Sequence, residues 1–184
     1  MSTRQIGAAI GSANTNVVAY HFGSKEALIE AVFRHRLEAI DRRRRDLLEA
    51  ADASGASAGL HDLVRVFALP LFEQVNGAGR HSYARFLAGL EWAGRLSTRA
   101  LLVPDFPETE RVIARMAALV PPTMAAKLPQ RLRLATGMLT TALHIIDSSE
   151  DPQGPAASTY YENAMAMAAA AIAAPPVPEG EGHP

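Results

Sequence analysis

Apolar residues recur along most of the chain at intervals of three and four positions, which is the period of a helix with one buried face. The stretch from residue 60 to residue 75 is typical, because one apolar stripe runs along it: Leu63, Val66, Phe67, Leu71 and Val75. Runs of alternating β-branched residues, which would indicate strands, are missing. The pattern therefore predicts an all-α protein.

Glycines, prolines and small polar residues interrupt this pattern and set the boundaries of the expected helices. Ser24 is a good N-cap, Asn76-Gly77 ends a helix, and Pro70 should kink or shorten the helix that contains it. The expected helices cover residues 3–10, 15–21, 25–51, 60–75, 82–96, 108–119, 129–147 and 158–174, with a single turn at 123–128.

These helices fall into three parts. Residues 1–45, called the head below, hold two short helices and run into a long connecting helix. Residues 46–174, called the body, would form a helical bundle. Residues 175–184 are rich in proline, glycine and acid, so we expect a disordered tail.

Composition excludes several classes of protein. The chain has 184 residues, 48% of them hydrophobic, and no cysteine, which rules out disulfides, thiol nucleophiles and cysteine-bound zinc. No apolar run reaches the roughly 18 residues of a membrane span, and the N-terminus lacks a signal-peptide pattern. We therefore expect a cytoplasmic protein without a membrane partner, and no pattern indicates a cofactor or a metal.

Charge is uneven along the chain. Residues 1–45 hold eight basic and four acidic residues, a net charge of +4, whereas the whole chain has a net charge of −1. A basic head on an acidic body favours an anionic partner for the head. The alternative is an ordinary solvated helix face.

The two short helices at the start have the arrangement of a helix-turn-helix. Ranges 3–10 and 14–21 are joined by the small residues Gly11-Ser12-Ala13. The second helix would begin with Asn14, Thr15 and Asn16, short polar side chains of the kind that contact base edges in the major groove. Tyr20, His21 and Lys25 would follow where backbone phosphates lie. The alternative is that the asparagines and threonine only cap a helix.

The end of this helix and the residues after it resemble the sequence of a known family. YHFGSKEALIEAVF, residues 20–33, is similar to the junction between the recognition helix and the following long helix in TetR family transcriptional regulators. Thr3-Arg4-Gln5-Ile6 also looks like the start of the preceding helix in that family. The resemblance implies that Thr3 caps this helix near a phosphate. It also implies a homodimeric repressor that binds palindromic double-stranded DNA and is released by a small molecule.

The chain departs from the family pattern at two places. Ala19 stands where the family usually has an aromatic residue, directly before Tyr20. Family members also carry a whole helix before the position of Thr3, where this chain has two residues. That helix would cover the apolar faces of the other two, so we expect an incomplete head that binds DNA weakly.

An effector site would lie in the body, as an apolar cavity with a few polar groups. Tyr83, Trp92, Thr141 and His144 are the candidate polar tips, and the ligand would be small and apolar or amphipathic. The candidate lining is Phe67, Tyr83, Phe86, Trp92, Met116, Met138, Thr141 and His144. The alternative is that these side chains form an ordinary core.

The last two helices are rich in small residues, which favours close helix packing across a twofold dimer interface. The candidate interface residues are Leu139, Leu143, Tyr161, Met165, Ala168, Ala169 and Ile172. The alternative is that these helices pack only within their own chain.

Two other functions remain open. An all-α enzyme has weak support, since His35-x-x-Glu38 is a single reversed fragment of a di-iron spacing without partners on other helices. A protein-binding adaptor would use the run of four arginines at 42–45. We expect a ligand-responsive regulator and no enzymatic activity.

Overall fold

The computed structural model describes residues 17–55, 57–94 and 105–175, and all regular structure in these ranges is helical. This confirms the all-α prediction. The helices are α2 (Val17–Phe22), α3 (Lys25–Ala53), α4 (Leu60–Glu73), α5 (Ser82–Trp92), α6 (Pro107–Ala118), α7 (Pro122–Ala125), α8 (Leu128–Asp147) and α9 (Pro155–Ala173).

Most expected boundaries lie within a few residues of the observed ones. Ser24 caps α3 as predicted, because its hydroxyl accepts a hydrogen bond from the Ala27 N–H at 3.0 Å. The last helix begins at Pro155, three residues before its expected start, since proline fits the first turn of a helix. The expected helix at 3–10 and the first residues of the next one lie outside the described ranges.

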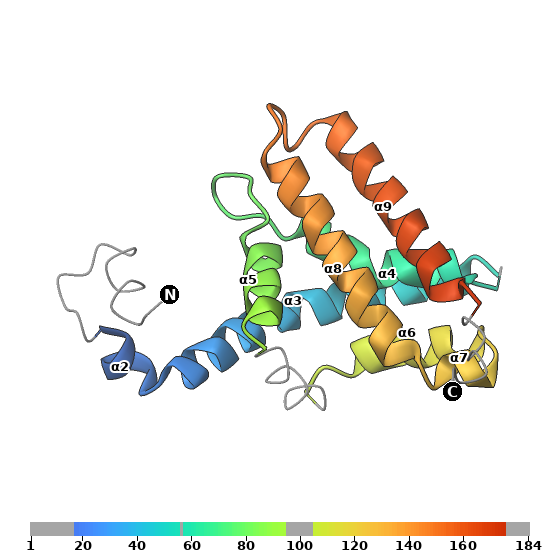
Figure 1. Ribbon diagram of the computed structural model, residues 1–184, viewed down its shortest axis with the longest axis horizontal. Helices are drawn as coiled ribbons and strands as arrows, with labels where there is room; N and C mark the ends of the chain where they lie inside the picture. Colours follow the sequence, from blue (N-terminus) through green and yellow to red (C-terminus); the bar gives the residue numbers. More distant parts are fainter. Residues whose placement is uncertain (1–16, 56, 95–104, 176–184) are drawn as a thin grey trace, which may run out of the picture.

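Helix α4 occupies the middle of the bundle and packs against α3, α6 and α9. Helices α8 and α9 form an antiparallel pair on one side of it (Figure 1). Helix α3 runs from the bundle to α2, which lies at the far end of the molecule from α7 (Figure 1). The 29-residue α3 therefore runs from α2 in the head into the body.

A buried polar cluster joins α3, α4 and α6 inside this bundle. Arg44 is 1% exposed, and its guanidinium donates to the Phe67 carbonyl oxygen from Nε at 3.2 Å and from Nη2 at 2.6 Å. Its Nη1 donates to Thr109 Oγ1 at 2.7 Å. Asp41 accepts from the backbone N–H groups of Thr109 at 3.0 Å and Glu108 at 3.4 Å, so a carboxylate of α3 caps the start of α6.

The cluster bonds α4 in the turn that precedes Pro70. Pro70 lies inside α4, and the helix continues three residues beyond it. Proline has no N–H for the Val66 carbonyl, and its ring crowds the preceding turn. In that turn, Arg44 donates to the Phe67 carbonyl and the Tyr161 hydroxyl donates to the Ala68 carbonyl at 3.3 Å. Neighbouring helices thus supply donors to the turn that proline weakens.

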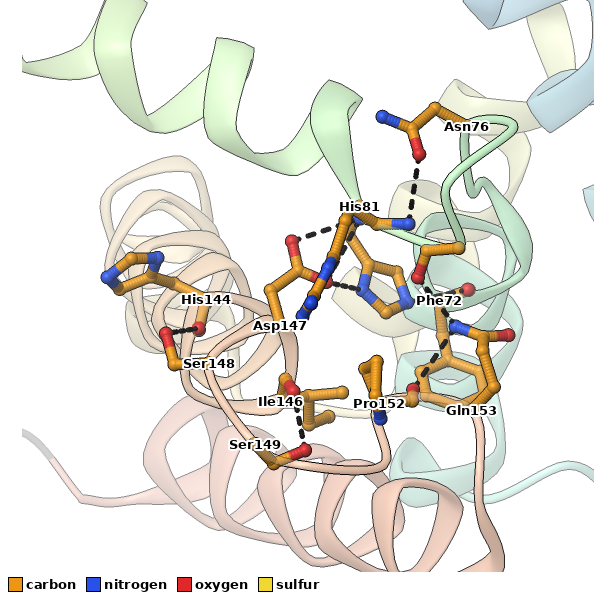
Figure 2. Close-up of polar contacts among 12 residues, drawn as sticks. Phe72, Asn76, His81, His144, Ile146, Asp147, Ser148, Ser149, Pro152 and Gln153 are labelled. Atoms are coloured by element: carbon orange, nitrogen blue, oxygen red, sulfur yellow. Dashed lines mark hydrogen bonds and ion pairs between the residues drawn. The ribbon is translucent and has the colours of Figure 1, made fainter.

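A second buried cluster fixes the start of α5 against the end of α8 (Figure 2). Asp147 accepts hydrogen bonds from the His81 backbone N–H at 3.1 and 3.0 Å, and lies 2.7 Å from the ring Nδ1. The other ring nitrogen, Nε2, lies 3.0 Å from the Phe72 carbonyl oxygen. The Phe72 ring stacks on His81 and on Tyr161, so the cluster also reaches α9.

Candidate functional site

The described end of the head presents aromatic and basic side chains to solvent. Tyr20 is 81% exposed, His21 is exposed, and their rings meet edge to face with centroids 5.0 Å apart. Gly23 has φ of +75°, which lets the chain turn sharply between α2 and α3. Lys25, in the first turn of α3, is half-buried. The structure therefore brings three of the predicted DNA-binding residues together at one junction.

The other four predicted DNA-binding residues lie outside the described ranges. They are Thr3, Asn14, Thr15 and Asn16.

Much of the basic charge of the head is paired within the chain. Arg34 bonds Asp105 and Glu30, and Arg43 makes a two-bond pair with Glu73 at 2.8 Å for each bond. These hydrogen bonds raise the pKa of both guanidinium groups. Arg42 pairs with Glu38, and Arg44 is buried as described above. The charge excess of the head is therefore a weaker sign of an anionic partner than the sequence indicates.

The predicted effector-binding residues do not line one cavity. Phe67, Tyr83 and Met116 are buried in the core, and Phe86 and Met138 pack against it. Phe67 and Tyr83 border a cavity of about 10 Å³ beside Arg44, which has room for about one water molecule at most. In the described structure Phe67, Tyr83 and Met116 are thus core residues, and this small cavity does not hold an organic effector.

A larger cleft lies between α5 and α8 and includes two predicted residues, Trp92 and Thr141. Its volume is about 230 Å³. The cleft is lined by Leu87, Ala88, Glu91, Trp92, Arg133, Thr136, Gly137, Thr140 and Thr141. His144 is exposed on α8 and points away from the His81 cluster (Figure 2).

Glu91 and Arg133 are the charged residues of this cleft, and the sequence analysis missed both. Arg133 Nε donates to Glu91 Oε1 at 2.6 Å, whereas Glu91 Oε2 is buried without a hydrogen-bond partner. The sequence gives only a slight indication that these two residues lie together. Glu91 precedes the single tryptophan, and Arg133 lies one helical turn before Gly137 on α8.

A second groove, of about 430 Å³, lies where the ends of α3 and α6 meet. Its charged side chains are Asp52 and Arg115, which make two hydrogen bonds with each other at 2.7 and 2.8 Å. The bonds from Arg115 lower the pKa of Asp52. Because this carboxylate has both oxygens occupied, the groove has a weaker claim as a ligand site than the α5–α8 cleft.

All seven predicted dimer residues are buried within the chain itself, where α8 and α9 pack on each other and on α4. They are Leu139, Leu143, Tyr161, Met165, Ala168, Ala169 and Ile172. Their burial corrects the residue assignment, because a second chain would meet the opposite faces of these helices. The exposed large apolar residues there are Leu134, Ile145, Tyr160 and Met167.

Within the ranges that the structure describes, no helix combines the length and hydropathy of a membrane crossing. The same ranges contain no group of three or more histidine, aspartate or glutamate side chains arranged to hold a metal ion.

Comparison with protein families, with curated proteins and with solved structures returned no match to this chain.

Proposed function

We propose that this protein is a ligand-responsive, DNA-binding transcriptional regulator, a repressor that acts as a homodimer and resembles the TetR family. The single observation that carries the proposal is the junction at residues 20–33. There, a short helix with exposed Tyr20 and His21 leads through Gly23 and the Ser24 cap into a long helix. An exposed aromatic pair next to a basic residue suits contact with a phosphate backbone.

The position of α2 supports the same reading. It lies at the end of the molecule opposite α7, so it can approach a duplex without interference from the body (Figure 1). Helix α3 extends from that end to the bundle and carries Asp41 and Arg44 into the contact with α6. A change in body packing would therefore move α2 through one continuous helix.

The outer face of α8 and α9 supports a homodimer. Glu162 is the one charged residue of α9, and it pairs with Arg65 of α4. Leu134 and Met167, on the outer faces of α8 and α9, are 75% and 61% exposed. Exposed large apolar side chains on two neighbouring helices are typical of a protein interface, and a twofold dimer is its simplest closed form. Two heads would then address two half-sites of a palindrome.

Binding to a pool of random-sequence duplex DNA, measured by fluorescence anisotropy at increasing KCl, tests the proposal. We expect affinity to fall steeply with salt, because phosphate contacts release counterions. The two lysines of the chain give a matched pair of variants, since Lys25 adjoins α2 and Lys127 precedes α8. Lys25→Gln should weaken binding and lower the salt slope by about one, whereas Lys127→Gln should change neither. No salt-dependent duplex binding at micromolar protein would contradict the proposal and favour the adaptor.

A further inference from the structure

We propose that His81 and Asp147 form a proton-dependent latch between three helices. With a hydrogen on each ring nitrogen, His81 ties the start of α5 to the ends of α4 and α8 (Figure 2). Loss of one of these hydrogens opens the contact with α4. The latch operates whether or not the protein binds DNA, because it depends only on the buried pair and its neighbours.

Both ring nitrogens of His81 face oxygen acceptors. Nδ1 lies 2.7 Å from Asp147 Oδ1, and Nε2 lies 3.0 Å from the Phe72 carbonyl oxygen. A carbonyl oxygen carries no hydrogen, so the contact with Phe72 is a hydrogen bond only if Nε2 is the donor. The contact with Asp147 needs a second hydrogen. Both oxygens of this carboxyl group also accept from the His81 backbone N–H, which favours the carboxylate and leaves the second hydrogen on the ring.

The Phe72 carbonyl lacks the donor that a helix normally supplies. Phe72 lies in the last turn of α4, which ends at Glu73. The N–H four residues further on, of Asn76, donates instead to the Arg80 carbonyl oxygen at 2.9 Å. His81 Nε2 therefore satisfies an acceptor at the end of a helix. This end of a helix also favours a positive charge, so α4 stabilises the imidazolium form of the ring.

Burial increases the difference between the two protonation states. The His81 side chain is 1% exposed and that of Asp147 is 6% exposed. An imidazolium beside a carboxylate has no net charge. Removal of the second proton leaves a negative charge in the interior and turns a bare ring nitrogen toward the Phe72 carbonyl oxygen, and both changes are costly where water is excluded. The folded chain therefore binds this proton more tightly than the unfolded chain does.

Other titratable and charged groups lie on the elements packed against His81. The phenol of Tyr161 on α9 donates to a backbone carbonyl, the carboxylate of Glu73 on α4 pairs with an arginine of α3, and His144 on α8 points away (Figure 2). Arg80 precedes His81 in the chain and adds a positive charge, which opposes the imidazolium. The carboxylate of the latch and the end of α4 offset this opposition.

The latch fixes the direction in which stability changes with pH. A histidine of an unfolded chain loses its proton near about pH 6.5. Because the folded chain holds the proton more tightly, the contribution of the latch is fully present below that pH and decreases as the pH rises. A histidine buried in its neutral form gives the opposite direction, since unfolding then takes up a proton at low pH.

Urea unfolding of the wild type and of His81→Gln between about pH 5.5 and 8.5 tests this direction. The glutamine amide can reach the position of Nε2 and donate to Phe72 at every pH in this range. We expect the ratio of the unfolding constants, variant over wild type, to fall about tenfold as the pH rises, which corresponds to one hydrogen bond to a charged group. The matched control is His144→Gln, at an exposed histidine of α8, and its ratio should stay constant.

The nitrogen NMR spectrum of the histidine rings in the wild type needs no variant. At about pH 7.5, both ring nitrogens should carry a hydrogen in a larger fraction of molecules at His81 than at the exposed His144. If His81→Gln does not fold, this comparison decides alone. A ratio of unfolding constants that is constant or rises with pH, or a doubly protonated fraction at His81 no larger than at His144, would overturn the latch.

Discussion

The guanidinium of Arg44 lies over the Phe67 ring, 4.6 Å from the ring centroid, and donates two hydrogen bonds to the carbonyl oxygen of the same residue. One side chain of α3 thus holds both the backbone and the aromatic ring of a residue on α4. Its third bond, to Thr109, extends this contact to α6. Helix α3, which extends to α2, is therefore fixed to α4 and α6 by a specific polar contact as well as by apolar packing.

Replacing Arg44 should be among the most destabilising single changes in the chain. Arg44→Ala leaves the buried Phe67 carbonyl and the Thr109 hydroxyl without their charged donor, and each buried group left unpaired costs about 1–3 kcal/mol. Arg44→Lys should recover little, because an ammonium group does not present the planar set of donors. Arg45→Ala, at an exposed neighbour, should stay within about 0.5 kcal/mol of the wild type in urea unfolding. Equal effects at 44 and 45 would contradict the contact.

A substitution in the His81 cluster, at the start of α5, should cause a separate loss of folding stability. Both ring nitrogens face oxygen acceptors, and a neutral imidazole can donate to only one of them. Asp147→Asn removes the negative charge that accepts from the ring and the backbone, so we expect a loss of about 1.5–3 kcal/mol. The exposed Asp46→Asn should be nearly neutral. Thermal unfolding of the two variants checks this difference.

The buried phenol of Tyr161 leads us to expect that the free energy of unfolding decreases at alkaline pH. Burial raises the pKa of this phenol, and the nearby positive charge of Arg44 opposes the rise only in part. Tyrosines of an unfolded chain ionise near pH 10, so above about pH 10 the unfolded state loses this proton while the folded state keeps it. The contribution of Tyr161 to the free energy of unfolding is therefore fully present below about pH 10 and decreases as the pH rises further.

The free energy of unfolding of Tyr161→Phe should therefore depend less steeply on pH than that of the wild type between about pH 9.5 and 11.5. At neutral pH it should cost about 1 kcal/mol, for the lost bond to the Ala68 carbonyl. Tyr20→Phe, at an exposed ring, is the control and should follow the wild-type curve. A parallel alkaline curve for Tyr161→Phe would show that this phenol does not contribute.

The outer face of α8 and α9 predicts the oligomeric state. The wild type should be a dimer at micromolar concentration by light scattering, and Ile145→Asp or Met167→Glu should make it a monomer. Both changes place a charge on an exposed apolar position of the proposed interface. Leu119→Glu makes the same kind of change at the end of α6, and this variant should stay dimeric. A monomeric wild type would rule out the interface.

Periodicity and caps were sufficient to predict the helices, because each depends on residues a few positions apart. The start of α3 at Ser24 and the extent of α8 follow from such local signals. Burial of Arg44 also left a trace: it continues the apolar stripe Phe33, Leu37, Ile40 and Leu48 at helical spacing. In a run of four arginines, that trace is hidden by the charge of its neighbours.

The assignment of residues to a dimer interface or an effector site depends on which face of each helix meets which neighbouring helix. The local sequence pattern does not determine this. Helix α9 is apolar on both faces, so the pattern does not tell Met165, which is buried, from Met167, which is exposed. Aromatic residues such as Phe67 and Tyr83 were expected around a ligand and instead fill the core. The α5–α8 cleft is lined in part by Glu91 and Arg133, which become neighbours only when α5 packs on α8.

Selection of binding sites from a random duplex pool, followed by sequencing, tests the central claim of a DNA-binding dimer most directly. At micromolar protein, the account predicts enrichment of an inverted repeat, with half-site centres separated by about one helical turn of 10–10.5 base pairs or a multiple of it. A pool that shows no enriched sequence after repeated selection, or one enriched without twofold symmetry, would contradict the account.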